Sequence, residues 1–158
     1  MGPLARFPLP EAAHVPGANP RPDEAAFDAL KAAVPAETTT EGAGDNAAWQ
    51  HGLRLIAAGY YWEAHEVLEP VWLNAAPNSP ERHLLRAAIQ LANAALKQRM
   101  GRPGAALRLC AIVEAEARAA GPGPVMGLGA SPFAAAAARL RAALAAGRME
   151  PVTLESAI

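Results

Sequence analysis

The sequence has little of several features that would point to a particular class of protein. A single cysteine, Cys110, excludes an internal disulfide and fits a reducing cytoplasm. Lysine and arginine (14 residues) nearly balance aspartate and glutamate (15), so no basic surface argues for nucleic-acid binding. The longest strongly apolar run, 133–138, is too short to span a membrane. The N-terminus lacks the charged start and apolar middle of a signal peptide, so we expect a cytoplasmic protein.

Apolar residues are numerous, but many of them are small. Of the 82 hydrophobic residues, which make up 52% of the chain, 41 are alanines. Alanine favours helices more than it fills space, so the core must come from larger residues, chiefly 17 leucines. Lysine is scarce, with 2 residues against 12 arginines. High alanine, glycine, proline and arginine with little lysine is typical of GC-rich bacterial genomes, so we expect a bacterial source.

Proline is concentrated at the N-terminus, where six of the fifteen prolines fall within the first 22 residues. Because proline fixes φ and lacks a backbone N–H, this stretch is expected to be an extended arm rather than a helix. Its large apolar side chains favour partial docking on the body of the protein: Leu4, Phe7, Leu9 and Val15. We therefore divide the chain into an arm (1–22), a single helical domain (23–147) and a C-terminal tail (148–158).

Capping residues, prolines and glycines mark helix starts and ends along the rest of the chain. Ser79 and Ser131 each precede a proline, which combines an N-cap with proline at the first helical position. Asp23 and Asp45 are further N-cap candidates. No window has the period-2 pattern of β-branched residues that a strand requires. The sequence thus predicts an all-α fold, a compact bundle of about six helices over 23–34, 45–59, 60–74, 79–100, 103–121 and 131–147.

The chemically richest stretch is 59–72, which holds both tyrosines and two of the three tryptophans. At 100° per residue, one helix face combines polar groups with the largest aromatics. Its members include Tyr61, Trp62, His65, Glu66, Leu68, Glu69 and Trp72. The opposite side is apolar as well, and a helix that is apolar nearly all round is buried. We therefore expect His65 and Glu69 inside the protein, where titratable groups need partners.

Pro70 lies inside this predicted helix. Proline removes a backbone hydrogen bond and costs about 3 kcal/mol in a helix interior. Either the helix kinks or restarts there, or it bends to follow its neighbours. A kink would turn Trp72 away from Trp62 and open a groove between them.

The next predicted helix carries one polar stripe on an otherwise apolar surface. The stripe spans an arc of about 80° and consists of His83, Arg86, Gln90, Asn93 and Lys97. It is either a solvated face or a partner surface, in which Arg86 or Gln90 turns inward to meet His65, Glu66 or Glu69. Arginine suits the second role because its planar guanidinium pairs with a carboxylate through two hydrogen bonds.

Three interpretations of His65 with Glu69 stay open. They form a structural pair that orients aromatic side chains, or they line a ligand pocket between helices with Trp62 and Trp72 as walls. Alternatively, they begin a metal or acid–base site, because His-Glu-x-x-Glu resembles half of a metal-binding helix. In that case His65 and Glu69 are the candidate metal ligands, although tetrahedral sites need further ligands such as His51 or His83.

The block from Gly59 to Trp72, followed by 86–97 and Gly101, resembles a family of small bacterial, archaeal and plastid proteins called domain of unknown function 309. The resemblance covers about 45–115 and implies an all-helical fold with no accepted activity, substrate or cofactor. It carries over six signature positions: Glu63, His65, Glu66, Glu69, Trp72 and Gln90. The chain departs from the family at Pro70, where a helix former is usual, and at Lys97, where many members have histidine.

Together these observations predict a non-enzymatic helical module that binds a small ligand or a protein partner between the helices 60–74 and 79–100. The candidate binding residues are Trp62, Glu63, His65, Glu66, Glu69, Trp72, Arg86 and Gln90. One alternative is a metal-dependent or acid–base hydrolase that uses His65, Glu66 and Glu69. Another is a scaffold that forms homodimers through its alanine-rich helix faces. No cofactor is identified by the sequence, and neither nucleic acid nor a membrane is an expected partner.

Overall fold

The computed structural model describes residues 7–154, and over these residues it is built from helices without a strand. This confirms the predicted all-α bundle of about six helices. The α-helices are α1 (Asp28–Ala32), α2 (Ala47–Ala57), α3 (Tyr61–Leu73), α4 (Pro80–Arg99), α5 (Pro103–Ala120) and α6 (Ser131–Ala145), with short 3-10 turns at Glu24–Phe27 and Ala43–Asp45. None of the helices in this part of the chain is long and apolar enough to cross a membrane.

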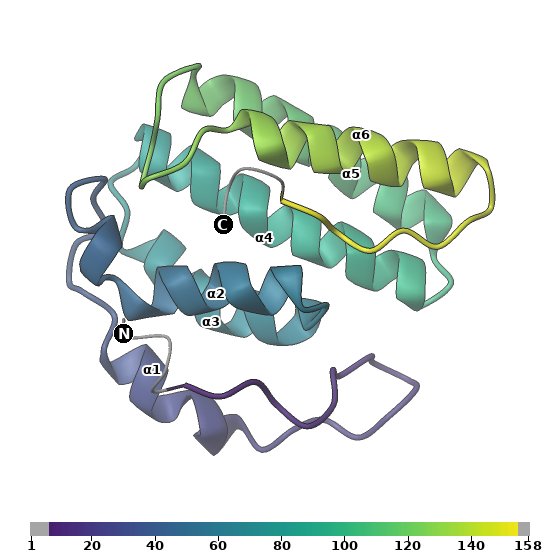
Figure 1. The fold of residues 1–158 in the computed structure, drawn as a ribbon, viewed down its shortest axis with the longest axis horizontal. Helices are drawn as coiled ribbons and strands as arrows, with labels where there is room; N and C mark the ends of the chain where they lie inside the picture. The colour runs from purple at the N-terminus through teal and green to yellow at the C-terminus, as the bar shows by residue number, and fades with distance from the viewer. Residues whose placement is uncertain (1–6, 155–158) are drawn as a thin grey trace.

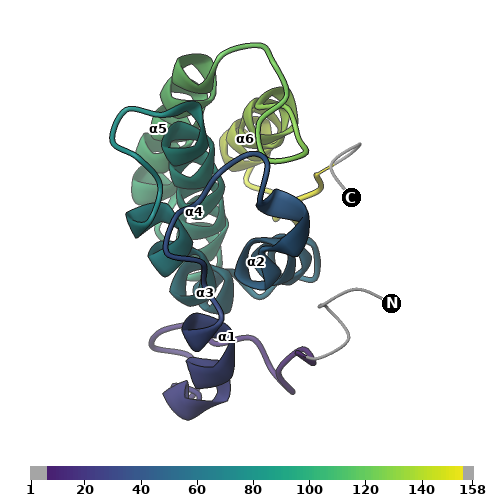
Figure 2. The same cartoon turned by 90° about the vertical axis from the view of Figure 1, so that its left-hand side faces the viewer.

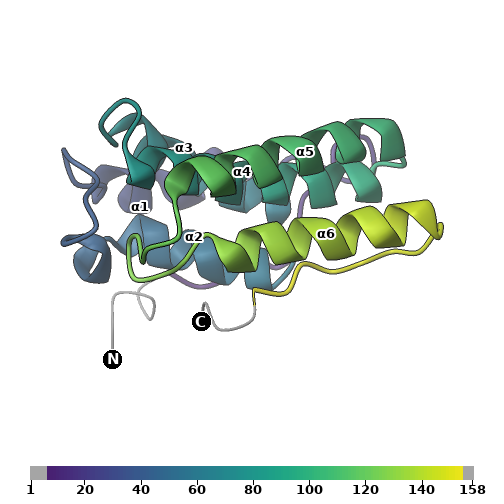
Figure 3. The same ribbon diagram turned by 90° about the horizontal axis from the view of Figure 1, so that it is seen from above.

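Successive helices pack against one another from α2 to α6, and α4 also contacts α6. The views in Figures 1 and 2 place α4 in the middle, with the α2–α3 pair on one side and the α5–α6 pair on the other. Seen from above, α4 and α5 run along each other, with α6 beside them (Figure 3). Because α4 has neighbours on several sides, its leucines Leu84, Leu85 and Leu91 are fully buried.

The helix starts follow the predicted capping signals in part. Ser79 caps α4, since its hydroxyl accepts a hydrogen bond from the backbone N–H of Arg82 at 3.1 Å, and Pro80 takes the first helical position. For α2, the cap is Asn46 rather than the predicted Asp45, and α6 begins at Ser131 without a side-chain cap. An asparagine caps as well as an aspartate, so the shift by one residue costs α2 little.

The first predicted helix, 23–34, is shorter and less regular than expected. Asp23 does act as a cap, because its carboxylate accepts from the N–H of Ala25 at 3.0 Å. The turn that it starts is 3-10, however, and only the five residues of α1 are α-helical. Pro35 follows and favours an extended conformation at the residue before it, which helps to end the segment.

Pro70 neither breaks nor restarts α3, which continues from Tyr61 to Leu73. The proline sits in the last turn, and the helix ends three residues later. The backbone N–H of Asn74 still donates to the carbonyl of Pro70 at 3.2 Å, so the final turn remains closed. The rings of Trp62 and Trp72 nevertheless contact different residues. Trp62 packs against His14 of the arm, and Trp72 packs against Arg82 of α4.

The N-terminal arm docks on α3, as its apolar content predicted. The hydroxyl of Tyr60 donates to the carbonyl of Pro10 at 2.8 Å, and the backbone N–H of His14 donates to Glu63 at 2.9 Å. Three arm side chains pack against the core as partly buried residues: Phe7, Leu9 and Val15. The first six residues of the predicted arm, with Leu4, lie outside the described part of the chain.

The C-terminal tail also returns to the body of the protein. It runs back beside α6 in Figures 1 and 3, and the backbone N–H of Val152 donates to the hydroxyl of Tyr61 at 3.0 Å. Val152 and Leu154 are buried. The tail is therefore held at the same end of α3 as the arm, while 155–158 lie outside the described residues.

The close approach of α2 and α3 generates a stability prediction. A Cβ atom at Gly52 would lie 2.3 Å from Cδ2 of Leu68, which is fully buried, so the Leu68 side chain or the helices would have to shift. Gly52→Ala should therefore lower the free energy of unfolding by about 1–3 kcal/mol despite the better helix propensity of alanine. Gly104→Ala in the first turn of α5 is the control, because no atom beyond its neighbours lies nearer than 3.9 Å. Urea unfolding of both variants tests this, and equal stabilities would contradict it.

The lowered pKa of His51 predicts how the free energy of unfolding changes with pH. Burial, with a smaller contribution from the charge of Arg54, lowers the pKa of His51 from 6.5 to about 4. Below pH 6.5 the unfolded chain binds a proton at His51 that the folded protein does not bind until about pH 4. The free energy of unfolding should therefore decrease as the pH falls from 6.5 to about 4, by up to about 3 kcal/mol. Carboxylates titrate in the same range, so the measured quantity is the difference between the wild type and His51→Gln in urea unfolding. A difference that does not change with pH would refute the prediction.

Candidate functional site

A cavity of about 400 Å³ lies between α3 and α4, where the sequence predicted a site. Residues of α3 form one wall and residues of α4 the other, and the lining consists of His65, Glu69, Trp72, Arg86, Ile89, Gln90 and Asn93. The lining combines an imidazole, a carboxylate, a guanidinium, two amides and an apolar surface. Such a mixture of convergent polar groups and apolar walls is typical of small-molecule sites.

His65 links the two walls of this cavity. Its Nδ1 lies 3.1 Å from Oδ1 of Asn93 on α4, and its Nε2 lies 2.9 Å from Oε2 of Glu69 one turn along α3. Asn93 in turn donates from Nδ2 to the side-chain carbonyl of Gln90 at 3.1 Å. Both ring nitrogens of His65 therefore have an oxygen atom within hydrogen-bond distance. The chain of contacts fixes the orientation of His65 and holds four polar side chains at one end of the cavity.

Trp72 forms the apolar wall at the other end. The guanidinium of Arg82 lies 4.4 Å from the centre of its ring, within cation–π range, and Arg82 is held in place by a 2.9 Å bond to the carbonyl of Ala75. The indole Nε1 of Trp72 is buried and has no hydrogen-bond partner among the described residues. Trp72 thus packs against Arg82 and also lines the α3–α4 cavity.

Arg86 lies between this cavity and a smaller one of about 220 Å³. Its partner is Glu116 on α5, at 3.2 Å, and the same carboxylate lies 2.7 Å from Nδ1 of His83. The expectation that Arg86 or Gln90 meets Glu66, Glu69 or His65 directly is therefore not what the structure shows. Gln90 reaches His65 only through Asn93, and Arg86 pairs with a third helix.

The eight candidate residues from the sequence divide into two groups. Five of them line the cavity together: His65, Glu69, Trp72, Arg86 and Gln90. The other three face away from it, toward the arm and α1. Trp62 contacts the ring of His14 at 5.0 Å between centres, Glu63 accepts the N–H of His14, and Glu66 lies 3.5 Å from Nζ of Lys31.

Glu63 is the most unusual of these three, because its side chain is fully buried. Oε2 accepts the backbone N–H of His14 at 2.9 Å, while Oε1 has no hydrogen-bond partner among the described residues. Burying a carboxylate is costly unless it is hydrogen-bonded. Glu63 is therefore an anchor of the arm rather than part of the cavity wall.

Two residues of the lining, Ile89 and Asn93, were not among the binding residues predicted from the sequence. Asn93 was part of the polar stripe on the fourth predicted helix, but nothing in the local sequence shows that it meets His65, 28 residues earlier. Ile89 is buried and looks like any core residue of α4. Only the antiparallel pairing of α3 and α4 brings both of them to the cavity.

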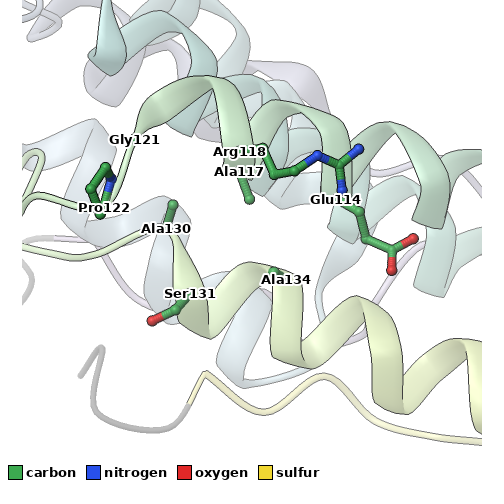
Figure 4. Close-up of a pocket in the computed structure, with 8 residues that line it drawn as sticks. All are labelled: Glu114, Ala117, Arg118, Gly121, Pro122, Ala130, Ser131 and Ala134. Carbon is green, nitrogen blue, oxygen red and sulfur yellow. The ribbon is translucent and has the colours of Figure 1, made fainter.

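Two other hollows in the described part of the chain lack the side-chain amides that line the α3–α4 cavity. A cavity of about 450 Å³ lies between α5 and α6, and Figure 4 shows Ala117 and Ala134 on its two sides. Its one carboxylate, Glu114, is already paired with Arg141. A larger hollow of about 630 Å³ lies under the arm, with mostly apolar walls and the buried His51. Neither brings an imidazole, a carboxylate and amides together as the α3–α4 cavity does.

Over residues 7–154, no group of three or more histidine, cysteine, aspartate or glutamate side chains is placed to hold a metal ion. Glu66 and His83, which the metal alternative would need, contact Lys31 and Glu116 respectively. His65 and Glu69 remain together, but their neighbours in the cavity are amides and an arginine.

Comparison with known proteins agrees with the resemblance noted in the sequence. Residues 49–109 match the family described as "Domain of unknown function (DUF309)". Over this segment the chain is similar to the DUF309 family. The match extends from Trp49 in α2 to Leu109 in α5. All seven residues of the cavity lie within the matched segment, whereas the arm, α1 and α6 lie outside it. No curated protein and no solved structure matches the chain.

The buried Glu63 generates a prediction about the arm. Glu63→Ala removes the acceptor of the His14 N–H, so the arm should dock less tightly and the free energy of unfolding should fall by about 1–3 kcal/mol. Amide exchange of His14 should become faster, which NMR hydrogen exchange measures directly. Glu66→Ala on the same helix is the control, because its partner Lys31 is not on the arm. Unchanged exchange at His14 in Glu63→Ala would show that the carboxylate does not anchor the arm.

Proposed function

We propose that this protein binds a small ligand in the cavity between α3 and α4. The observation that carries the proposal is the lining itself, in which His65, Glu69 and Gln90 face a common space with the indole of Trp72. The volume of about 400 Å³ falls within the range of small-molecule sites, about 300–1,000 Å³. The cavity suits a small molecule better than a protein partner, which would need a much larger contact area.

The hydrolase alternative finds less support in these contacts. It requires Glu66 beside His65 and Glu69, but Glu66 pairs with Lys31 and is not part of the cavity lining. A homodimeric scaffold that associates through alanine-rich helix faces stays an alternative prediction. A cytoplasmic location and a bacterial source rest on composition alone and stay predictions.

Titration with small polar fragments, followed by NMR of the isotope-labelled protein, tests the proposal. The chain has three tryptophans, so its spectrum should contain three indole N–H signals, and Trp72→Phe identifies the one that reports on the cavity. Trp62 beside the arm and Trp49, whose Nε1 donates to the carbonyl of Met126, serve as internal controls. We expect fragments at millimolar concentration to shift the Trp72 signal and leave the other two unchanged.

A matched pair of variants gives the test its control. Gln90→Ala removes a polar group from the cavity and should weaken the fragments that bind, by about threefold to tenfold for one lost hydrogen bond. Gln98→Ala lies two turns further along α4, where the side chain donates to the carbonyl of Arg148 in the tail, and should leave binding unchanged. If a diverse fragment set never moves the Trp72 signal selectively, the proposal is wrong.

A further inference from the structure

Two opposite charges face the α3–α4 cavity without pairing with each other. Glu69 lies on the α3 wall and Arg86 on the α4 wall. Within residues 7–154, Glu69 bonds to His65 and Arg86 bonds to Glu116, and no ion pair joins the two. The cavity therefore presents a carboxylate and a guanidinium as separate binding groups.

Both groups keep hydrogen-bonding capacity that the described residues do not use. His65 contacts only Oε2 of Glu69, and 52% of the Glu69 side chain is exposed. Arg86 uses only one of its terminal nitrogens, and its side chain is 47% exposed. A guanidinium offers five N–H donors, so most of them remain free for a ligand. Gln90 adds donors, because its carbonyl accepts from Asn93 while its amide nitrogen has no partner in the described part of the chain.

An apolar surface lies beside these charged groups. His65 meets Asn93, whereas Trp72 lines cavities with Arg82 and Arg86, so α3 and α4 run in opposite directions across the cavity. Glu69 lies one turn from Trp72 on α3, and Arg86 lies one turn from Ile89 and Gln90 on α4. Trp72 and Ile89 thus supply an apolar patch within reach of both charges.

We propose that the cavity binds a free α-amino acid with an apolar or aromatic side chain. The ammonium group binds Glu69, the carboxylate binds Arg86 and Gln90, and the side chain packs on Trp72 and Ile89. This inference rests on the proposed function, since it names the ligand class of the same cavity. A simple anion would meet the unpaired oxygen of Glu69, and a simple cation would meet Arg86, whereas a zwitterion satisfies both.

Four compounds of closely related shape test the inference. L-Phenylalanine and L-leucine carry both charges, phenylalaninamide lacks the carboxylate, and 3-phenylpropionate lacks the ammonium group. Each is titrated into the wild-type protein while NMR follows the indole signal of Trp72, with Trp49 and Trp62 as internal controls. We expect both amino acids to shift the Trp72 signal, and the two analogues of phenylalanine to bind about threefold to fivefold more weakly, as expected for partly exposed ion pairs.

Substitutions on each wall test whether Glu69 binds the ammonium group of the amino acid and Arg86 its carboxylate. Glu69→Gln should remove the preference for phenylalanine over 3-phenylpropionate and keep the preference over phenylalaninamide. Arg86→Gln should do the reverse. The controls are Glu66→Gln, whose carboxylate faces Lys31, and Arg108→Gln on the exposed face of α5, and both should keep the wild-type order. Both tested side chains are about half exposed, so the fold should tolerate their neutral replacements.

The outcomes separate this inference from the proposed function. If fragments shift the Trp72 signal but neither amino acid does, the cavity binds ligands of another class and the inference is wrong. Equal affinity for phenylalanine and its two analogues would also overturn it, because the charges would then contribute nothing. If neither fragments nor amino acids act on Trp72, both proposals fail together.

Discussion

The burial of α4 is the constraint on which the rest of the structure depends. The helix contacts α3, α5 and α6, and ten of its twenty residues are buried. Five of those ten are alanines, Ala87, Ala88, Ala92, Ala94 and Ala95, which let the neighbouring helix axes come close. Surrounded in this way, α4 has only a narrow stripe for polar residues. Three members of that stripe, Arg86, Gln90 and Asn93, line the seam with α3, so the α3–α4 cavity has a polar wall.

The alanine content therefore has two distinct effects. In the centre of the bundle, buried alanines set the spacing between helices, and the leucines between them fill the core. In α6, which contacts fewer elements, residues such as Ala135 are exposed and contribute helix propensity rather than packing. A hydrophobic fraction of 52% thus describes a bundle with closely spaced helices more than one with a voluminous core.

Local signals made much of this fold predictable. Ser79 with Pro80 marked the start of α4, and the spacing of four residues between His65 and Glu69 predicted their contact. The partners that could not be predicted lie far apart in sequence, such as Glu116 for Arg86 and Asn93 for His65. Helical periodicity assigns a residue to a face, but only the packing of whole helices decides which side chain it meets there. For this reason the two helices chosen from the sequence do enclose a cavity, while three of the eight candidate residues face elsewhere.

The first turn of α3 holds both ends of the described chain through main-chain atoms. Tyr60 bonds to the carbonyl of Pro10, Glu63 to the N–H of His14, and Tyr61 to the N–H of Val152. These contacts recognise peptide groups, not the side chains of the arm or the tail. These three backbone bonds therefore do not depend on the residue types at Pro10, His14 and Val152, although the side chains of His14 and Val152 are themselves buried. A chimera that carries a foreign arm of similar length would keep its attachment points as long as α3 is left intact.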